Sequence, residues 1–162
     1  MDASIQLPTT AMPAVFVKAG GDRFGQKRGL GIDTLDFKVT SRESSGVFVL
    51  EITMHTKGGP VRHIHHDQDE WWYVVKGEFV LEIGKERFVL GEGDSAWGPR
   101  GVPHVWSNIS YPGAKFVAFV TPAGQAEAFF LEATKTNRLP GVESELFGRY
   151  GFEVVGPPLP IE

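Results

Sequence analysis

Residues 63–77 of the chain are HIHHDQDEWWYVVKG, and this stretch decides the fold. It starts with two alternating histidines, His63 and His65, and continues into WWYVV, a run of aromatic and β-branched residues typical of strands. Side chains two residues apart project from the same face of an extended strand, so both imidazoles can reach one point, whereas His66 projects elsewhere. His-x-His in a strand is therefore a chelating arrangement for a metal ion.

Two more side chains can complete such a site. Four residues separate Glu70 from His65, and a turn through residues 67–68 brings the Glu70 carboxylate back over the same face. His104, in a separate predicted strand, supplies a third nitrogen. This donor set leaves one or two open positions on a five- or six-coordinate ion, as a catalytic metal site requires. Taken singly, the same residues also fit a surface histidine pair, a solvated carboxylate and a hydrogen-bonded histidine, and spacing alone does not decide.

The segments around this stretch have the length and spacing of β-strands. Twenty glycines and 11 prolines interrupt the chain at short intervals. Residues 47–56 alternate between apolar and polar side chains, and residues 78–90 have the pattern of a hairpin with its turn at Gly84 and Lys85. Further strands are predicted at residues 95–98, 102–108 and 115–121. This rhythm predicts an all-β sandwich or barrel.

The two ends of the chain have other patterns. Residues 125–135 are rich in Ala, Glu and Leu, which predicts a short helix, and residues 142–150 are a second candidate. Residues 152–155 precede a proline-rich tail that cannot pair as a central strand. Near the N-terminus, residues 14–18 are a candidate strand within an extended arm.

Composition narrows the classes of cofactor and partner. The 162 residues are 41% hydrophobic and 22% charged, as in an ordinary globular domain. There is no cysteine, which excludes thiolate metal sites and iron–sulfur clusters. The net charge of -4 and the scattered Lys and Arg argue against nucleic acid as a partner. No stretch approaches the ~20 apolar residues of a membrane span, and the N-terminal residues do not have the pattern of a signal peptide, so we expect a soluble, cytoplasmic protein without a membrane partner.

A wider pattern joins two segments of the chain. In residues 63–77, the His-x-His pair is followed by Glu70 and then by Gly77. In residues 93–108, GDSAWGPRGVPHVWSN, five positions fit a second motif: Gly93, Pro99, Gly101, His104 and Asn108. Together these segments resemble the two motifs of the cupin superfamily, in its small single-domain, quercetin-dioxygenase-type form. One departure is Lys57, which stands where the first motif has a glycine.

The resemblance implies both a fold and a site. The fold is an all-β cupin double-stranded β-helix, or jelly-roll, barrel with one or two short C-terminal helices. The site is one divalent transition metal, Fe, Mn, Ni, Co, Cu or Zn, held by four ligands: His63, His65, Glu70 and His104. The expected organisation is an N-terminal arm with a candidate strand (residues 1–30), the barrel (31–122), and a C-terminal helix and tail packing on the barrel (123–162).

Cupins perform many functions, so the expected function rests on the site. Trp72 shares strand parity with Glu70, and Trp106 with His104, which makes both tryptophans candidates for lining the pocket. An ion of net charge about +1 between aromatic walls suits a planar or anionic substrate such as a flavonol, a diketone or a catechol.

The first functional hypothesis is a dioxygenase-like oxidoreductase resembling quercetinase, in which Glu70 is a metal ligand and the catalytic proton acceptor. The alternatives are a non-catalytic cupin that binds or senses a small molecule, and a metal-dependent isomerase or lyase. A small-molecule ligand is expected in each case. The resemblance further implies a homodimer.

Overall fold

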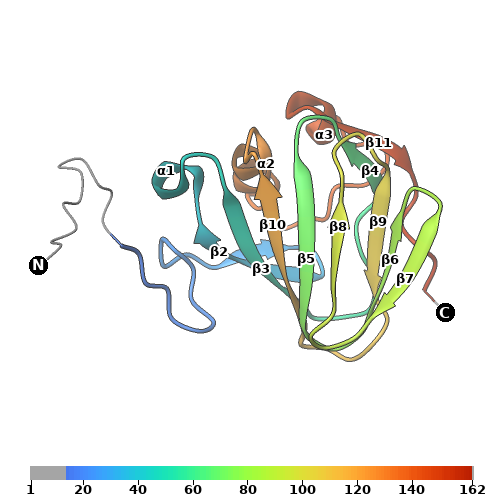
Figure 1. Ribbon diagram of the computed structural model, residues 1–162, viewed down its shortest axis with the longest axis horizontal. Helices are drawn as coiled ribbons and strands as arrows, with labels where there is room; N and C mark the ends of the chain where they lie inside the picture. Colours follow the sequence, from blue (N-terminus) through green and yellow to red (C-terminus); the bar gives the residue numbers. More distant parts are fainter. Residues whose placement is uncertain (1–13, 162) are drawn as a thin grey trace, which may run out of the picture.

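Two antiparallel β-sheets face each other and enclose the core in this computed structural model, which describes residues 14–161 (Figure 1). The first sheet contains, in spatial order, β1 (Arg28–Leu30), β2 (Asp33–Val39), β3 (Phe48–Met54), β10 (Ala114–Thr121), β5 (Asp69–Lys76) and β8 (Ser95–Gly98). The second contains β11 (Phe152–Gly156), β4 (Arg62–His65), β9 (His104–Asn108), β6 (Phe79–Ile83) and β7 (Glu86–Leu90). The described part of the chain also forms three short helices, α1 (Ser41–Ser44), α2 (Ala126–Ala133) and α3 (Leu146–Arg149). The predicted all-β barrel is confirmed.

Alternating side chains explain why these strands form two facing layers. In β3, Phe48, Leu50, Ile52 and Met54 are buried while the residues between them are partly exposed. Strand β10 alternates in the same way along its whole length. Because the side-chain period of a strand is two, one face of each strand fills the core and the other meets solvent. The core therefore lies between the sheets.

The hairpin and several strands occur where the sequence predicts them. Strands β6 and β7 pair in register around Gly84, whose positive φ of 59° suits a tight turn. Strand β8 has the predicted bounds, while β9 begins at His104, two residues later than predicted, directly after Pro103, which lacks a backbone N–H. Helix α2 lies within the predicted helix, and α3 occupies one turn of the second candidate.

The candidate strand at residues 14–18 is wrong, while the N-terminal arm stays a prediction because residues 1–13 lie outside the described residues. Residues 14–18 form no strand, and the first strands are β1 and β2, for which no strand was predicted. The sequence does carry a strand signal here, because residues 34–39 alternate between polar and apolar side chains with Leu35 and Phe37 buried, but it directly follows a glycine-rich, charged segment for which no strand was predicted.

The C-terminal segment adds a strand to the second sheet. β11 pairs with β4 at the sheet edge, so that Phe152 lies opposite His65 and Val154 opposite His63. An edge position suits this strand because Pro157 and Pro158 follow it directly. Strands β1 and β11 thus join the sheets from outside residues 31–122, and the three-part division of the chain stays a prediction. Within residues 14–161, no helix is long and apolar enough to cross a membrane.

Candidate metal centre and its pocket

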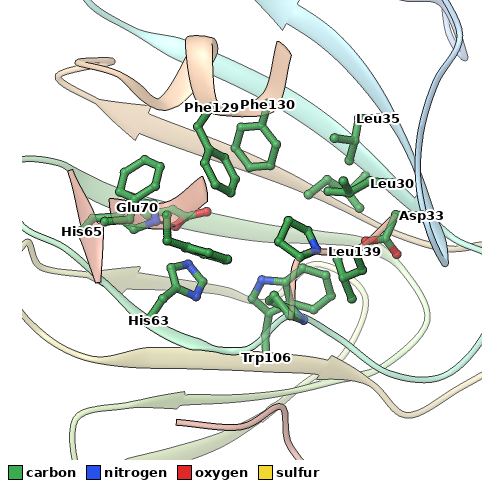
Figure 2. Close-up of a pocket in the computed structure, with 15 residues that line it drawn as sticks. Leu30, Asp33, Leu35, His63, His65, Glu70, Trp106, Phe129, Phe130 and Leu139 are labelled. Carbon is green, nitrogen blue, oxygen red and sulfur yellow. Dashed lines mark ion pairs between the residues drawn. The ribbon is translucent and has the colours of Figure 1, made fainter. Parts of the chain in front are cut away.

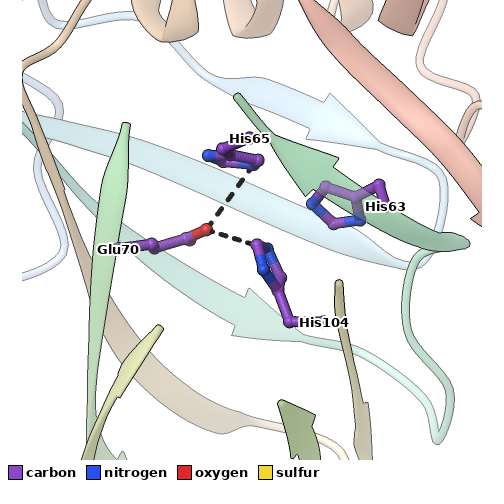
Figure 3. A group of neighbouring side chains, drawn as sticks. All are labelled: His63, His65, Glu70 and His104. Carbon is purple, nitrogen blue, oxygen red and sulfur yellow. Dashed lines mark ion pairs between the residues drawn. The ribbon is translucent and has the colours of Figure 1, made fainter. Parts of the chain in front are cut away.

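The two sheets bring four candidate ligands together. Strand β4 of the second sheet carries His63 and His65, and the adjacent strand β9 carries His104, which lies directly opposite His63 in the strand register. Glu70 comes from β5, in the first sheet. One donor atom from each of the four lies within 4.8 Å of the others, and all four residues are buried (Figure 3). Alternation along β4 and the barrel closure thus assemble the group that the sequence predicts.

The spacing of the donor atoms suits a bound ion. Glu70 Oε2 lies 3.4 Å from His104 Nε2 and 3.7 Å from His65 Nε2. Two donors that each bond one ion at about 2.1 Å are separated by roughly 3.0–3.4 Å. The His104–Glu70 separation falls at the upper limit of that range and the His65–Glu70 separation just above it, so small side-chain adjustments are enough to bind a metal.

Backbone contacts fix which nitrogen of two rings faces the centre. His63 Nδ1 lies 2.8 Å from the carbonyl oxygen of Val61, and His104 Nδ1 lies 3.2 Å from that of Val102. A carbonyl can only accept a hydrogen bond, so each Nδ1 carries the proton and each Nε2 keeps a free lone pair. The Nε2 of His104 is buried without a hydrogen-bond partner within the described residues. A metal ion would satisfy this nitrogen.

The environment keeps the imidazoles of His63 and His65 neutral. Burial, reinforced by the nearby His104, lowers the pKa of His63 to about 3. Burial also lowers the pKa of His65 well below its ordinary value, with His63 and His104 adding to the effect. Neutral imidazoles are the form that binds metals. The residues therefore fit a divalent transition metal bound by nitrogen and oxygen.

A partly enclosed pocket of about 50 Å³ lies against this cluster (Figure 2). His63, His65 and Glu70 form part of its wall, and α2 contributes Phe129 and Phe130. The other lining residues are Leu30, Asp33, Leu35, Ile52, Pro60, Trp106, Leu139, Pro140, Phe147 and Phe152. All of these except Asp33 have predominantly apolar side chains, so the cluster faces an apolar, aromatic chamber.

The two candidate tryptophans lie in different places. Trp106 lines the pocket next to the cluster. Trp72 packs edge-to-face against His104, with ring centroids 5.1 Å apart, and lines a separate small cavity together with Val74 and Phe116. Trp72 therefore packs behind a candidate ligand, and Trp106 lies on the pocket wall.

The remaining histidines lie outside the cluster. His66 is half-exposed and its Nε2 lies 2.9 Å from Glu153 Oε2. His55 Nε2 lies 2.6 Å from the hydroxyl oxygen of Thr34. The strand parity that assigns His66 to another face is confirmed.

Sequence reasoning missed Asp33 as a pocket residue. Asp33 is the first residue of β2, and it shares the buried face of that strand with Leu35 and Phe37. A charged residue at an inward position of an otherwise apolar strand face is the signal that identifies it. That signal is only visible once residues 33–39 are known to be a strand.

Residues 50–120 match the family described as Cupin domain. The fold is that of a cupin. No curated protein matches the sequence. One similar solved structure is KdgF from Halomonas sp., with 17% identity and a TM-score of 0.59 over 68% of this chain and 94% of that one. A second is an RmlC-like cupin from Shewanella frigidimarina NCIMB 400, with 21% identity and a TM-score of 0.52 over 63% of this chain and 87% of that one. A third is Streptomyces Pac13, a nucleoside dehydratase, with 13% identity and a TM-score of 0.54 over 85% of this chain and 87% of that one.

The matched residues 50–120 include the buried His63, His65, Glu70 and His104 cluster, a group suited to a metal ion. At identities below 25%, the solved structures show the fold alone. They therefore leave the reaction to be argued from the site.

Proposed function

We propose that this protein is a metal-dependent oxidoreductase of the dioxygenase type that acts on a small planar or anionic organic compound. The observation that carries this proposal is the apolar, aromatic pocket that faces the buried cluster of three imidazoles and one carboxylate. In the reaction both atoms of dioxygen are transferred to the substrate, so the substrate is oxidised, dioxygen is reduced, and no further reductant is needed.

The chain's own residues would have distinct parts in this chemistry. When bound, the metal supplies a centre of net charge about +1 that attracts an anionic oxygen and, if redox-active, electrons for reaction with dioxygen. The three histidines hold it, with His63 and His104 oriented by their backbone hydrogen bonds. Glu70 holds it and accepts the proton that the substrate loses on binding. Phe129, Phe130 and Trp106 exclude water and pack against the substrate.

The size of the pocket favours compact substrates. Sites that enclose drug-sized ligands have volumes of about 300–1000 Å³, far above the 50 Å³ of this pocket. A diketone or a catechol therefore suits it better than a flavonol, which would require the segment carrying Leu139, Pro140 and Phe147 to move away.

A second candidate is a metal-dependent isomerase or lyase, and Asp33 is the observation that favours it. This acid lines the same pocket, and burial raises its pKa to about 7, so it can give or take a proton near neutral pH. Glu70 is a second carboxyl group in the same pocket, so a base and an acid can act at two positions of one substrate.

The test is oxygen uptake by protein reconstituted with each of Fe(II), Mn(II), Co(II), Ni(II), Cu(II) and Zn(II), using acetylacetone, catechol and a flavonol as substrates. We expect uptake with a redox-active metal and the diketone or the catechol, and none in a His104→Ala variant. Substrate conversion without oxygen uptake would establish the isomerase or lyase instead. Binding without any conversion would establish a binding or sensing protein. The homodimer stays a prediction, tested by light scattering.

A further inference from the structure

The pocket has polar groups on two opposite sides. Figure 2 shows His63, His65 and Glu70 on one side and Asp33 on the other, with the apolar lining between them. Asp33 pairs with Leu30 of β1 and with Met54 of β3, and both neighbours are buried and apolar. Pairing with two strands therefore fixes the backbone of Asp33, and its side chain lies between apolar neighbours.

Among residues 14–161, the Asp33 side chain has no hydrogen-bond or ion-pair partner to account for its burial. The residue is 3% exposed, and its Oδ1 is buried without a hydrogen-bond partner among the described residues. None of the described lysines, arginines or histidines forms an ion pair with it. Burying a carboxyl without a hydrogen bond destabilises a fold, so such a group calls for a functional explanation. Burial also raises its pKa to about 7, so that both protonation states are available near neutral pH.

A second aspartate, Asp22, has the hydrogen bonds and the ion pair that a carboxyl with a structural role makes. Asp22 accepts hydrogen bonds from the backbone N–H groups of Phe24, Gln26 and Phe37, and it pairs with Arg28 Nε at 3.2 Å. Burial alone would raise its pKa, but these hydrogen bonds and the Arg28 charge lower it. Asp22 thus ties a loop to β2. Asp33 has none of these contacts, and a structural role does not explain it.

We propose that Asp33 hydrogen-bonds the end of the substrate that lies away from the metal. It thereby selects compact molecules that have an oxygen donor for the metal at one end and a hydroxyl or N–H group at the other. The inference rests on the proposed function only in placing the first end at the metal. A ligand without the second group leaves Asp33 buried and unsatisfied, which is the penalty that produces selectivity.

The first measurement is thermal unfolding of metal-free protein at pH 8. Asp33→Leu and Asp33→Asn both remove an unsatisfied ionised group, so the Tm should rise by about 2–4 °C or more in each. Asp22→Asn is the matched control, and its Tm should fall because three hydrogen bonds and an ion pair are weakened. A fall in Tm for both Asp33 variants would show that Asp33 has a structural partner, and would overturn the inference.

The second measurement is equilibrium binding of benzoate, 3-hydroxybenzoate and 4-hydroxybenzoate to metal-reconstituted protein. These probes share a carboxylate for the metal and differ in one donor. Wild-type protein should prefer a hydroxylated probe by about tenfold or more. Asp33→Leu should reduce that preference to about one while its metal content stays the same.

Three outcomes separate this inference from the proposed function. A preference that persists in Asp33→Leu, or no binding of any probe by wild-type protein, would overturn the inference. A preference that depends on Asp33 without any oxygen uptake would support the inference and contradict only the oxidoreductase. Loss of metal in Asp33→Leu would show that Asp33 acts on the cluster and not on the ligand, and would also overturn it.

Discussion

The two polar ends of the pocket differ in how their side chains are satisfied. At the cluster, the rings of His63 and His104 are oriented by backbone carbonyls, and their free nitrogens converge with the Glu70 carboxylate and the His65 ring. At the other end, Asp33 lies alone among apolar residues. The cluster is thus preorganised for one invariant partner, a metal ion. Asp33 retains unused hydrogen-bonding capacity for a ligand that binds and dissociates. Substitutions in the cluster should therefore weaken metal binding, whereas substitutions of Asp33 should stabilise the metal-free fold.

The largest effect is expected from His104→Ala, which should abolish stoichiometric metal binding. This residue supplies a buried nitrogen that has no other partner among the described residues. Loss of groups that merely orient a ligand weakens metal affinity by about 10–100-fold, so loss of the ligand itself should cost at least that. Metal analysis after dialysis measures the occupancy, and circular dichroism verifies the fold. Full occupancy in a folded variant would contradict the assignment of the cluster.

A second prediction concerns the pH dependence of stability in metal-free protein. The pKa of Asp33 is about 7 in the folded state against 3.8 for the ordinary group, so the folded state binds this proton more tightly. Its contribution to stability is therefore lost as pH rises from about 4 to about 7. Asp33→Asn lacks this dependence. Its free energy of unfolding minus that of wild type should therefore grow across that pH range, by at most ~4 kcal/mol, and stay constant above it.

The quantity to measure is the difference in free energy of unfolding between wild type and Asp33→Asn, because the histidines have the opposite pH dependence. The pKa values of His63 and His65 are lowered in the folded state, so their contribution is lost as pH falls below about 6.5. This slope is common to wild type and Asp33→Asn and cancels in the difference. Glu70 is the other titratable residue lining the pocket, and it is also common to both. Urea unfolding at pH 4.5, 6 and 8 gives the curve, and a flat difference would contradict an unsatisfied Asp33.

The sequence predicts the cluster well and Asp33 not at all, for a physical reason. His63 and His65 are two residues apart, and a strand places both on one face whatever the rest of the fold does. Recognising Asp33 requires β2 to be identified first. That strand has an alternating pattern with Asp36 and Lys38 on its outer face, but Asp33 at its first position reads as an outer or turn residue until the pairing of β2 with β3 places it on the inner face.

The fold shows the same division between local and distant determinants. The β6–β7 hairpin is predictable because one turn sets its register. Helix α2 is predictable as a helix, but the packing of Phe129 against Phe147 and Phe152 depends on segments that only meet in the folded chain. Apart from Trp106, the walls of the pocket therefore could not be derived from the sequence, whereas the candidate metal ligands could.

Glu70→Gln should weaken metal binding by about tenfold without abolishing it. The amide oxygen remains a donor, but a poorer one for a divalent ion, and the cluster loses its only negative charge. Asp69→Asn is a matched control because Asp69 precedes Glu70 on β5 and pairs with Arg100 at the surface. Its metal affinity should equal that of wild type in a competition titration with a chelator. Equal affinities for all three proteins would remove Glu70 from the ligand set.

The smallest effect is expected from His66→Ala, which tests whether metal binding requires a histidine at the positions of the cluster or a histidine anywhere near it. His66 directly follows the ligand His65, yet it is half-exposed and pairs with Glu153 at the surface. Exposed ion pairs contribute about 0–1 kcal/mol, so the free energy of unfolding should change by less than ~1 kcal/mol. Metal occupancy should stay stoichiometric, since one residue further along the chain the side chain projects away from the cluster. The measurement is metal analysis beside urea unfolding. Loss of metal from this variant would mean that the strand parity on which the ligand assignment rests is wrong.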